Sequence, residues 1–330
     1  MAAGGEHADG PTVTLLVPSY RRPEMLRRCL DGVLAGTRLP EQIVVVLRDT
    51  DAESRAALEG WQAEHPGLVA VAEVSAAGPM AAANAGLALA RGDVVALIDD
   101  DCVPTERWLE RILAHYADPE VIGVGGRDIV HHGDSVSAEP RPVVGRVTWY
   151  GRIIGNHHQP GFAEPVSVDH LKGANMSFRR AVIPTYDLRL RSGVYHEVDV
   201  AFGARAAGGR IVYDPAAAVD HYPAPRWYGH ERDSEALAAV TDLAHDHAYV
   251  MLKHLPGWRR AGFWLFALMV GQHHRYGLLR LLAMLPREGG LAVRRWRAAL
   301  RGLFAARHTR RAAVAGGSDP NAEHSGRSRA

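Results

Sequence analysis

Three consecutive aspartates, Asp99, Asp100 and Asp101, follow a short apolar run at residues 94–98. A short run rich in β-branched residues predicts a buried strand of a parallel sheet, and such sheets bind ligands at the carboxyl ends of their strands. Adjacent carboxylates repel one another unless a positive charge lies among them. Mg²⁺ and Mn²⁺ prefer oxygen ligands and often share them with substrate phosphates, so the cluster predicts a divalent-metal site. A helix N-cap would need one aspartate, not three.

Polar residues also follow other predicted strands. The segment 18–22 follows a strand expected at 13–17, where it could line a nucleotide site or serve only as an N-cap with solvated arginines. Asp49 follows a strand expected at 43–47, where it could accept hydrogen bonds from a base or ribose, or act as a turn residue. Right-handed crossovers would place these loops at one edge of the sheet.

Strands and helices alternate through the first half of the chain, which predicts a doubly wound, mostly parallel sheet of the α/β class. Asn84 is the one polar residue on a small-residue helix face that could pack close to the sheet and to a nucleotide. The expected strands are 13–17, 43–47, 69–74 and 94–98, and the expected helices are 23–34, 54–64 and 79–91.

The second half has a weaker pattern. Residues 127–170 show no clear period, and so long an irregular stretch is usually functional or mobile. A helix is expected at 198–207, a short strand at 211–213 and a helix at 235–254. From residue 262 the chain is helical, apolar and basic in pattern.

Composition narrows the class of protein. The chain has 330 residues, of which 47% are hydrophobic and 23% charged, and its net charge of +1 gives no global field that would select nucleic acid. Two cysteines are too few for a disulfide framework, which favours a reducing compartment. We find no signal-peptide pattern in the first ten residues and no apolar run of about 20 residues, so we expect a cytoplasmic protein.

Residues 12 to about 225 resemble the inverting glycosyltransferases of the GT-A fold, of the family-2 type. The matching motifs, in order, are Val17–Tyr20, Asp49, Asn84–Gly86 with Gly92–Asp93, and Asp99–Asp101. The resemblance implies transfer of a sugar from a nucleoside diphosphate, with UDP or GDP expected, to an acceptor hydroxyl or amine with inversion at the anomeric carbon.

The resemblance also implies roles for individual residues. It implies that Asp101 holds Mn²⁺ or Mg²⁺ together with Asp99 and His221, while the choice between Asp100 and Asp101 stays open. Asp49 would face the base and Asp99 would lie near the ribose. The implied nucleotide-site residues are Pro18, Ser19, Tyr20, Arg21, Asp49, Asn84, Asp99, Asp100 and Lys172.

Glu197 stands where the family has its catalytic aspartate, so the resemblance implies that it is the general base that takes the acceptor proton. Asp199 is the competing candidate. Both could instead form an acidic first turn that stabilises a helix N-terminus. Lys172 could meet the diphosphate or be a surface lysine.

Two other functions are compatible with an acidic α/β protein. A nucleotidyltransferase acting on sugar phosphates would usually have a Gly-rich phosphate loop after its first strand, where this chain has Pro18–Tyr20. A non-catalytic nucleotide- or glycan-binding protein would be expected to lack the aspartate cluster or the base. The expected partners are a nucleotide-sugar donor and a glycan, lipid-linked or small-molecule acceptor, and no nucleic acid.

These patterns predict the domain organisation. The C-terminal region could pack as a helical cap, or its arginines could make peripheral membrane contact. The basic positions are Arg287, Arg294, Arg295, Arg297 and Arg301. The predicted parts are a disordered N-terminus at 1–11, a GT-A catalytic domain at 12–230 with a nucleotide-sugar half at 12–126 and an acceptor half at 127–230, a helical extension at 231–304, and a disordered tail at 305–330.

Overall fold

A computed structural model describes residues 10–133, 135–136, 139–224, 236–272 and 275–316. The chain divides into two compact units. The first, which we call the sheet unit, comprises Met1–Arg146, Gly155–Pro184 and Val200–Ala224. The second, the helical unit, comprises Val147–Ile154, Thr185–Asp199 and Pro225–Ala330. The functional boundaries predicted at 126 and 230 stay predictions, and most of the segment predicted to be disordered at 1–11 lies outside the described residues.

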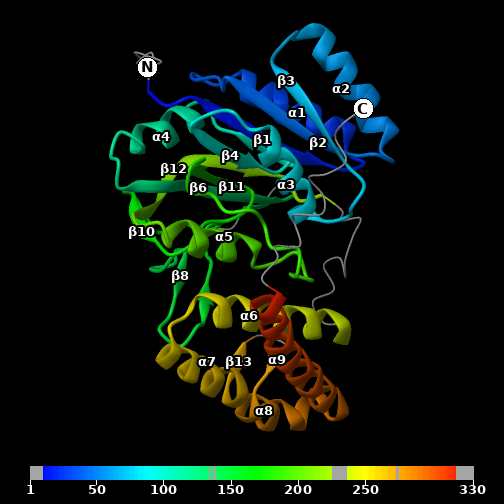
Figure 1. The fold of residues 1–330 in the computed structure, drawn as a ribbon, viewed down its shortest axis with the longest axis vertical. Coiled ribbons are helices and arrows are strands. Elements are labelled where there is room, and N and C mark those ends of the chain that lie inside the picture. Colours follow the sequence, from blue (N-terminus) through cyan, green and yellow to red (C-terminus); the bar gives the residue numbers. More distant parts are fainter. Residues whose placement is uncertain (1–9, 134, 137–138, 225–235, 273–274, 317–330) are drawn as a thin grey trace. The chain divides into compact units, whose positions relative to one another are not determined.

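The first half of the sheet unit is the expected alternation of strands and helices (Figure 1). Its four strands pair in parallel, in the spatial order β4-β1-β2-β3, so their carboxyl ends lie at one edge of the sheet. The strands are β1 (Val13–Ser19), β2 (Gln42–Arg48), β3 (Val69–Val74) and β4 (Val94–Ile98). The helices are α1 (Pro23–Leu34), α2 (Ala52–Glu64), α3 (Pro79–Leu89) and α4 (Trp108–His115).

The other half of this sheet is mixed. Strand β11 is antiparallel to both β4 and β6, while β12 is parallel to β6 and antiparallel to β5 and β10. These strands are β5 (Cys102–Pro104), β6 (Val121–His132), β10 (Val166–Val168), β11 (Asn175–Arg179) and β12 (Arg210–His221). Three shorter strands are β7 (Ser135–Val136), which pairs with β6, and the paired β8 (Arg146–Val147) and β9 (Ile153–Ile154).

Two predictions about this half were wrong in extent. Part of the stretch 127–170 is regular, because β6 continues to His132 and β10 adds an edge strand. The strand expected at 211–213 runs to His221. Its pairing with β6 shifts register between Asp214 and Val219, and such an irregularity breaks the period of two on which the sequence pattern depends.

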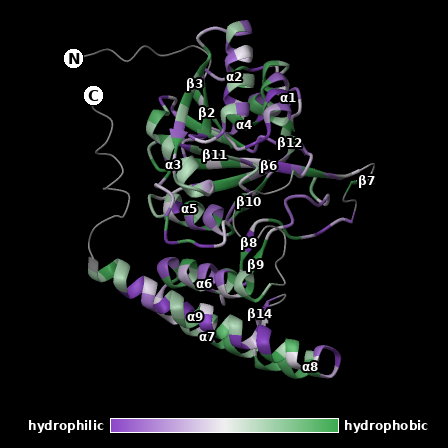
Figure 2. Ribbon diagram, turned by 90° about the vertical axis from the view of Figure 1, so that its right-hand side faces the viewer, coloured by the Kyte–Doolittle hydropathy of each residue, from purple (hydrophilic) through white to green (hydrophobic). Residues whose placement is uncertain are grey.

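Alternate residues of the strands point to opposite faces of the sheet and build the core there. The strands of the sheet are mostly coloured as hydrophobic in Figure 2. Odd-numbered residues of β1 and β2 pack with α1, α2 and α4 in one cluster. Helix α3 approaches the other face closely, because a Cβ built on Gly86 would lie 2.5 Å from a Leu16 side-chain carbon. The small-residue face of α3 therefore packs as expected.

The helical unit contains α6 (Leu237–His254), α7 (Gly257–Met269), α8 (Leu278–Glu288) and α9 (Gly290–Gly316). A short hairpin of β13 (Gly271–Gln272) and β14 (Arg275–Tyr276) joins α7 to α8. Helix α5 (His196–Arg205) begins in the helical unit and continues into the sheet unit after Asp199. None of the described helices has both the length and the apolar character needed to cross a bilayer.

Helix α9 corrects one prediction. We expected residues 305–330 to be disordered, but α9 continues through Gly316, and residues 317–330 lie outside the described part of the chain. Alanine and arginine are strong helix formers, and Ala306 is fully buried. Gly302 allows α9 to approach α6 closely, since a Cβ there would lie 2.2 Å from the Thr241 carbonyl oxygen. Packing on α6 therefore orders a segment that has little amphipathic pattern of its own.

Candidate active site

The three consecutive aspartates, which we call the acidic turn (Asp99–Asp101), leave β4 at the edge where β1 also ends. Asp100 is 2% exposed and is held by two donors. The Ser19 hydroxyl donates to its Oδ2 at 2.7 Å, and Arg22 Nη1 donates to its Oδ1 at 2.6 Å. Burial raises the pKa of Asp100 to about 6, although Arg22 and Ser19 oppose the rise. Asp100 thus anchors the turn to the end of β1.

Asp101 faces a histidine from a distant part of the chain. The antiparallel pairing of β5 with β12 sets His221 beside Cys102, and His221 Nε2 lies 3.3 Å from Asp101 Oδ1. The other oxygen of Asp101 accepts a hydrogen bond from the Ala224 backbone N–H at 2.9 Å. Burial acts to raise the pKa of Asp101, but His221 and Ala224 outweigh it and the net shift is downward. Asp101 is therefore stabilised as a carboxylate.

A second buried carboxylate orients the histidine. Asp128, on β6, is fully buried, and its Oδ1 accepts from His221 Nδ1 at 2.8 Å. Lys172 forms an ion pair with Asp128 Oδ2. Because Nδ1 donates to Asp128, Nε2 is the ring nitrogen that faces Asp101; with a proton it donates to Asp101, and without one its lone pair can bind a cation. Two acceptors 3.3 Å apart repel each other unless a proton or a cation lies between them.

Three side chains here lie close enough to share a metal ion: atoms of Asp101, Cys102 and His221 all lie within 4.8 Å of one another. Burial, together with the charges of Asp99 and Asp101, raises the pKa of the Cys102 thiol well above its usual value. A neutral thiol is a poor ligand for hard cations. The remaining carboxylate and imidazole suit Mn²⁺, or Mg²⁺ less well, with further positions left for phosphate oxygens and water.

The segment after β1 lies close to the end of β2. The Tyr20 ring has the Arg21 and Arg48 guanidinium carbons 5.2 Å and 5.5 Å from its centroid. Arg21 is exposed, with a φ of +56°, and its backbone N–H donates to Asp51 Oδ2 at 2.5 Å. Asp49 is exposed, and its Oδ1 lies 4.0 Å from Arg48 Nε. Charged and aromatic groups are thus available here to a ligand.

The structure brings together only some of the predicted residues. Ser19, Asp100, Asp101, His221 and Lys172 belong to one continuous set of contacts. Pro18 is half-buried in β1, Asn84 is half-buried on α3, and Asp99 is half-buried at the start of the turn.

Sequence reasoning included Arg22 only as part of the segment 18–22, and it did not identify Asp128. Arg22 contacts the acidic turn, and its Nη1 also lies 3.7 Å from Asp101 Oδ2. The neighbouring arginine pair was the only signal for it. Asp128 had no local signal, because it lies 93 residues before His221 in a stretch without a clear period.

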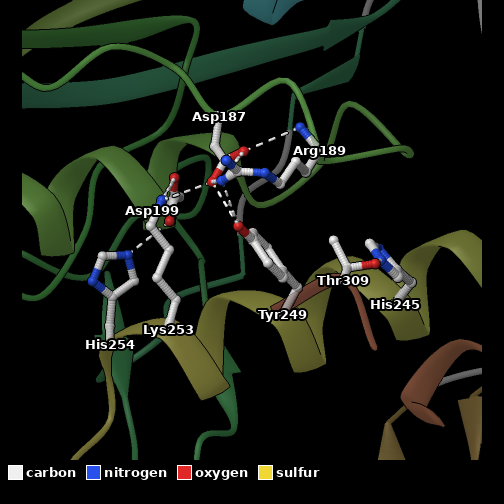
Figure 3. A network of polar contacts seen from close by, with 8 residues as sticks. All are labelled: Asp187, Arg189, Asp199, His245, Tyr249, Lys253, His254 and Thr309. Atoms are coloured by element: carbon white, nitrogen blue, oxygen red, sulfur yellow. Dashed lines mark hydrogen bonds and ion pairs between the residues drawn. The ribbon is translucent and has the colours of Figure 1, made fainter. Parts of the chain in front are cut away.

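The two candidate bases, Glu197 and Asp199, lie in the first turn of α5, within the helical unit. Asp199 is 3% exposed and is held by two donors from α6 (Figure 3). Lys253 Nζ lies 2.8 Å from its Oδ2, and His254 Nε2 lies 2.7 Å from its Oδ1. A carboxylate so fully engaged is a poor proton acceptor for a substrate.

Lys253 also joins Asp199 to Asp187. The Oδ2 atom of Asp187 accepts from Lys253 Nζ at 3.0 Å and from the Tyr249 hydroxyl at 2.8 Å (Figure 3). Burial acts to raise the pKa of Asp187, but Lys253 and the hydrogen bonds outweigh it and lower that pKa. We call the set of Asp187, Arg189, Asp199, Tyr249, Lys253 and His254 the Lys253 network.

Glu197 is held less firmly. Its side chain is 20% exposed, and Oε2 lies 3.3 Å from His196 Nδ1. That nitrogen is 3.1 Å from the Gly193 carbonyl oxygen, to which it donates, and among the described residues Glu197 Oε2 has no hydrogen-bond partner. Of the two carboxylates, Glu197 is therefore the one with an oxygen that no hydrogen bond among the described residues satisfies, and that oxygen is buried.

Comparison with known proteins places this arrangement in a family. Residues 11–238 match the family model described as "Glycosyltransferase like family 2". The chain belongs to this family. The match covers the predicted catalytic domain, including β1, the acidic turn, α5 and His221.

Relatives within the family are distant. The pre-mycofactocin glycosyltransferase of Mycobacterium tuberculosis is 27% identical over 66% of this chain and 44% of its own length. The glucosyl-dolichyl phosphate glucuronosyltransferase of Haloferax volcanii is 27% identical over 64% of this chain and 68% of its own length. The chain thus spans less than half of the first of these relatives.

Solved structures agree with the fold. The crystal structure of GalNAc-T7 with UDP, GalNAc and Mn²⁺ aligns with a TM-score of 0.62, at 15% identity, over 84% of this chain and 55% of that one. The predicted GT-A-type α/β fold, with a mostly parallel half-sheet and a C-terminal helical region, is confirmed.

Proposed function

We propose that this protein is a metal-dependent inverting glycosyltransferase that uses a nucleoside-diphosphate sugar. The observation that carries the proposal is the Asp101–His221 pair, in which Asp128 orients the imidazole so that Nε2 lies 3.3 Å from an oxygen of a buried carboxylate. Family membership supports sugar transfer, and the Mn²⁺ and UDP named with GalNAc-T7 support the metal and a nucleotide donor.

The residues of the sheet unit would bind the donor. Asp101 and His221 would hold Mn²⁺ or Mg²⁺, which when bound offsets the negative charge of the leaving diphosphate. Asp100 keeps the turn in place through Ser19 and Arg22 rather than acting as the metal ligand. The exposed groups after β1 and β2, including Asp49, would contact the nucleoside, with UDP or GDP expected.

Glu197 would act as the general base. The acceptor oxygen forms a bond to the anomeric carbon while the bond from that carbon to the diphosphate oxygen breaks, and the acceptor proton passes to the Glu197 carboxylate. A base in this role contributes about 10²–10⁴-fold to the rate. The acceptor is a glycan, a lipid-linked sugar or a small molecule, in keeping with the names of the relatives.

Nucleotide binding tests the metal site first. Thermal unfolding is measured with UDP, GDP, TDP, CDP and ADP, each with Mn²⁺, Mg²⁺ or chelator. We expect one nucleotide to stabilise the protein only with metal, and Asp101→Asn to abolish that shift. Asp118→Asn, at a half-buried aspartate paired with Arg210 outside the site, is the matched control and should keep it. A metal-dependent shift that survives Asp101→Asn would contradict the assignment.

Nucleotide release from the matching sugar donor then tests the base. Glu197→Gln should slow release by about 10²–10⁴-fold while the metal-dependent nucleotide shift persists. If Glu197→Gln releases nucleotide at the wild-type rate, Glu197 is not the base.

A further inference from the structure

Helix α8 carries an apolar stripe that faces solvent. Leu278, Leu279, Leu282 and Leu285 are 39%, 54%, 57% and 41% exposed. Their spacing of one, four and seven residues places them on one side of the helix. The helix is anchored on another side, where Leu281 packs with Tyr276 and Ala292 in a buried cluster. The exposed leucines are therefore not the residues that fix α8 in the helical unit.

Helix α7 repeats this feature. Trp258 and Leu265 are 68% and 65% exposed, and they lie seven residues apart, on one face of the helix. Helices α7 and α8 contact each other. We call these six residues on α7 and α8 the leucine face. Single exposed apolar residues are normal on a protein surface, but a group of this kind marks an interaction site.

The charged residues of the segment that carries the leucine face are almost all positive. Residues 255–316 contain 12 arginines, one glutamate and no lysine or aspartate, although the whole chain has a net charge of only +1. Arg280 and Arg287 are exposed on α8 itself, and Arg294 and Arg297 are exposed on α9. These arginines favour binding to an anionic partner. Because the leucines are also exposed, the partner must in addition accept apolar side chains.

We propose that the leucine face docks on the surface of an anionic phospholipid bilayer. Leucine and tryptophan side chains would enter the boundary between headgroups and acyl chains, while the arginines contact lipid phosphates. With 11 residues, α8 is about 16 Å long and would lie in the surface rather than cross it. A nucleic acid would match the arginines but not the leucines. This binding does not depend on the proposed sugar transfer.

Vesicle flotation of the full chain tests the proposal without donor or metal. The protein is mixed with vesicles of phosphatidylcholine alone, or of phosphatidylcholine with phosphatidylglycerol. We expect flotation with the anionic vesicles and much less with the neutral ones. The double variant Leu279→Ser with Leu282→Ser should bind roughly tenfold more weakly, and Arg280→Gln with Arg287→Gln roughly thirtyfold more weakly.

The matched control is Leu39→Ser with Leu89→Ser, two leucines of the sheet unit that are 42% and 40% exposed, and it should float like the wild type. A second readout needs no variant at α8: Trp258 fluorescence, isolated by difference from Trp258→Phe, should shift to the blue when anionic vesicles are added. Absence of both flotation and the shift would overturn the proposal. So would dimerisation in solution that the leucine variants abolish while vesicle binding is absent, because a second copy would then cover the face.

Discussion

The acidic turn and the Lys253 network both bury aspartates, but protein donors satisfy them to different degrees. In the Lys253 network, Asp199 has a donor at each oxygen, and Asp187 is held by Lys253 and Tyr249. In the acidic turn, Asp101 instead faces His221, whose ring is already engaged by Asp128. A carboxylate that is paired at both oxygens stabilises a fold, whereas a carboxylate beside an oriented imidazole offers two ligands to a cation.

Removing Asp199, a buried carboxylate that is paired at both oxygens, should give the largest loss of stability among these predictions. Asp199→Ala would leave Lys253 and His254 without this partner, and breaking a buried ion pair costs about 3–5 kcal/mol. Urea denaturation followed by far-ultraviolet circular dichroism measures the loss. Glu64→Gln, which breaks the exposed Arg27–Glu64 pair, should cost less than about 1 kcal/mol. Equal effects of the two variants would show that Asp199 is not a structural ion pair.

The same contrast explains what the sequence could predict. The aspartate cluster lies directly after its strand, so a local pattern identified it, and the parallel strand order placed Ser19 at the same edge. The partners of the cluster could not be predicted, because 93 residues separate Asp128 from His221 and 55 separate Asp199 from His254. Their pairing depends on tertiary packing and leaves no period in the sequence.

In the sheet unit, Asp128 is the buried carboxylate that orients a metal-ligand candidate, His221. Its oxygen orients His221 at 2.8 Å, so Asp128→Asn should lower Mn²⁺ affinity by about 10–100-fold. Mn²⁺ titration followed by electron paramagnetic resonance measures the affinity, with Asp118→Asn as the control outside the site. An unchanged affinity would mean that the histidine is not a ligand or does not need this partner.

Two buried histidines test whether the units respond alike to acid. Burial lowers the pKa of His247, in the helical unit, to about 3, with help from the charge of Arg275, and burial lowers the pKa of His157, in the sheet unit, to about 3 as well. A histidine of the unfolded chain titrates near its ordinary value of 6.5. Between these values the unfolded state binds a proton that the native state does not, so stability falls as the pH falls.

The expected size follows from this linkage. Each histidine should cost about 2 kcal/mol of unfolding free energy between about pH 6 and about pH 4.5. His247→Gln, which keeps a donor for the Gly151 carbonyl oxygen, should remove that part of the loss. Urea denaturation at the two pH values measures it, and the exposed His308→Gln is the control. An acid slope that His247→Gln leaves unchanged would show that His247 is protonated in the native state.

The smallest expected change in stability distinguishes two aspartates, Asp49 and Asp51, in the loop between β2 and α2. Asp51 is 2% exposed and caps α2 by accepting from the Ser54 N–H at 3.1 Å, and it also accepts from the Arg21 N–H. Asp51→Ala should therefore lower stability by about 1 kcal/mol, the usual cost of losing an N-cap. Asp49→Ala should leave stability unchanged, because Asp49 is exposed, and should instead weaken the nucleotide-dependent thermal shift. If Asp49→Ala destabilises the protein as much as Asp51→Ala does, then Asp49 is a structural residue of the loop and is not available to a nucleotide.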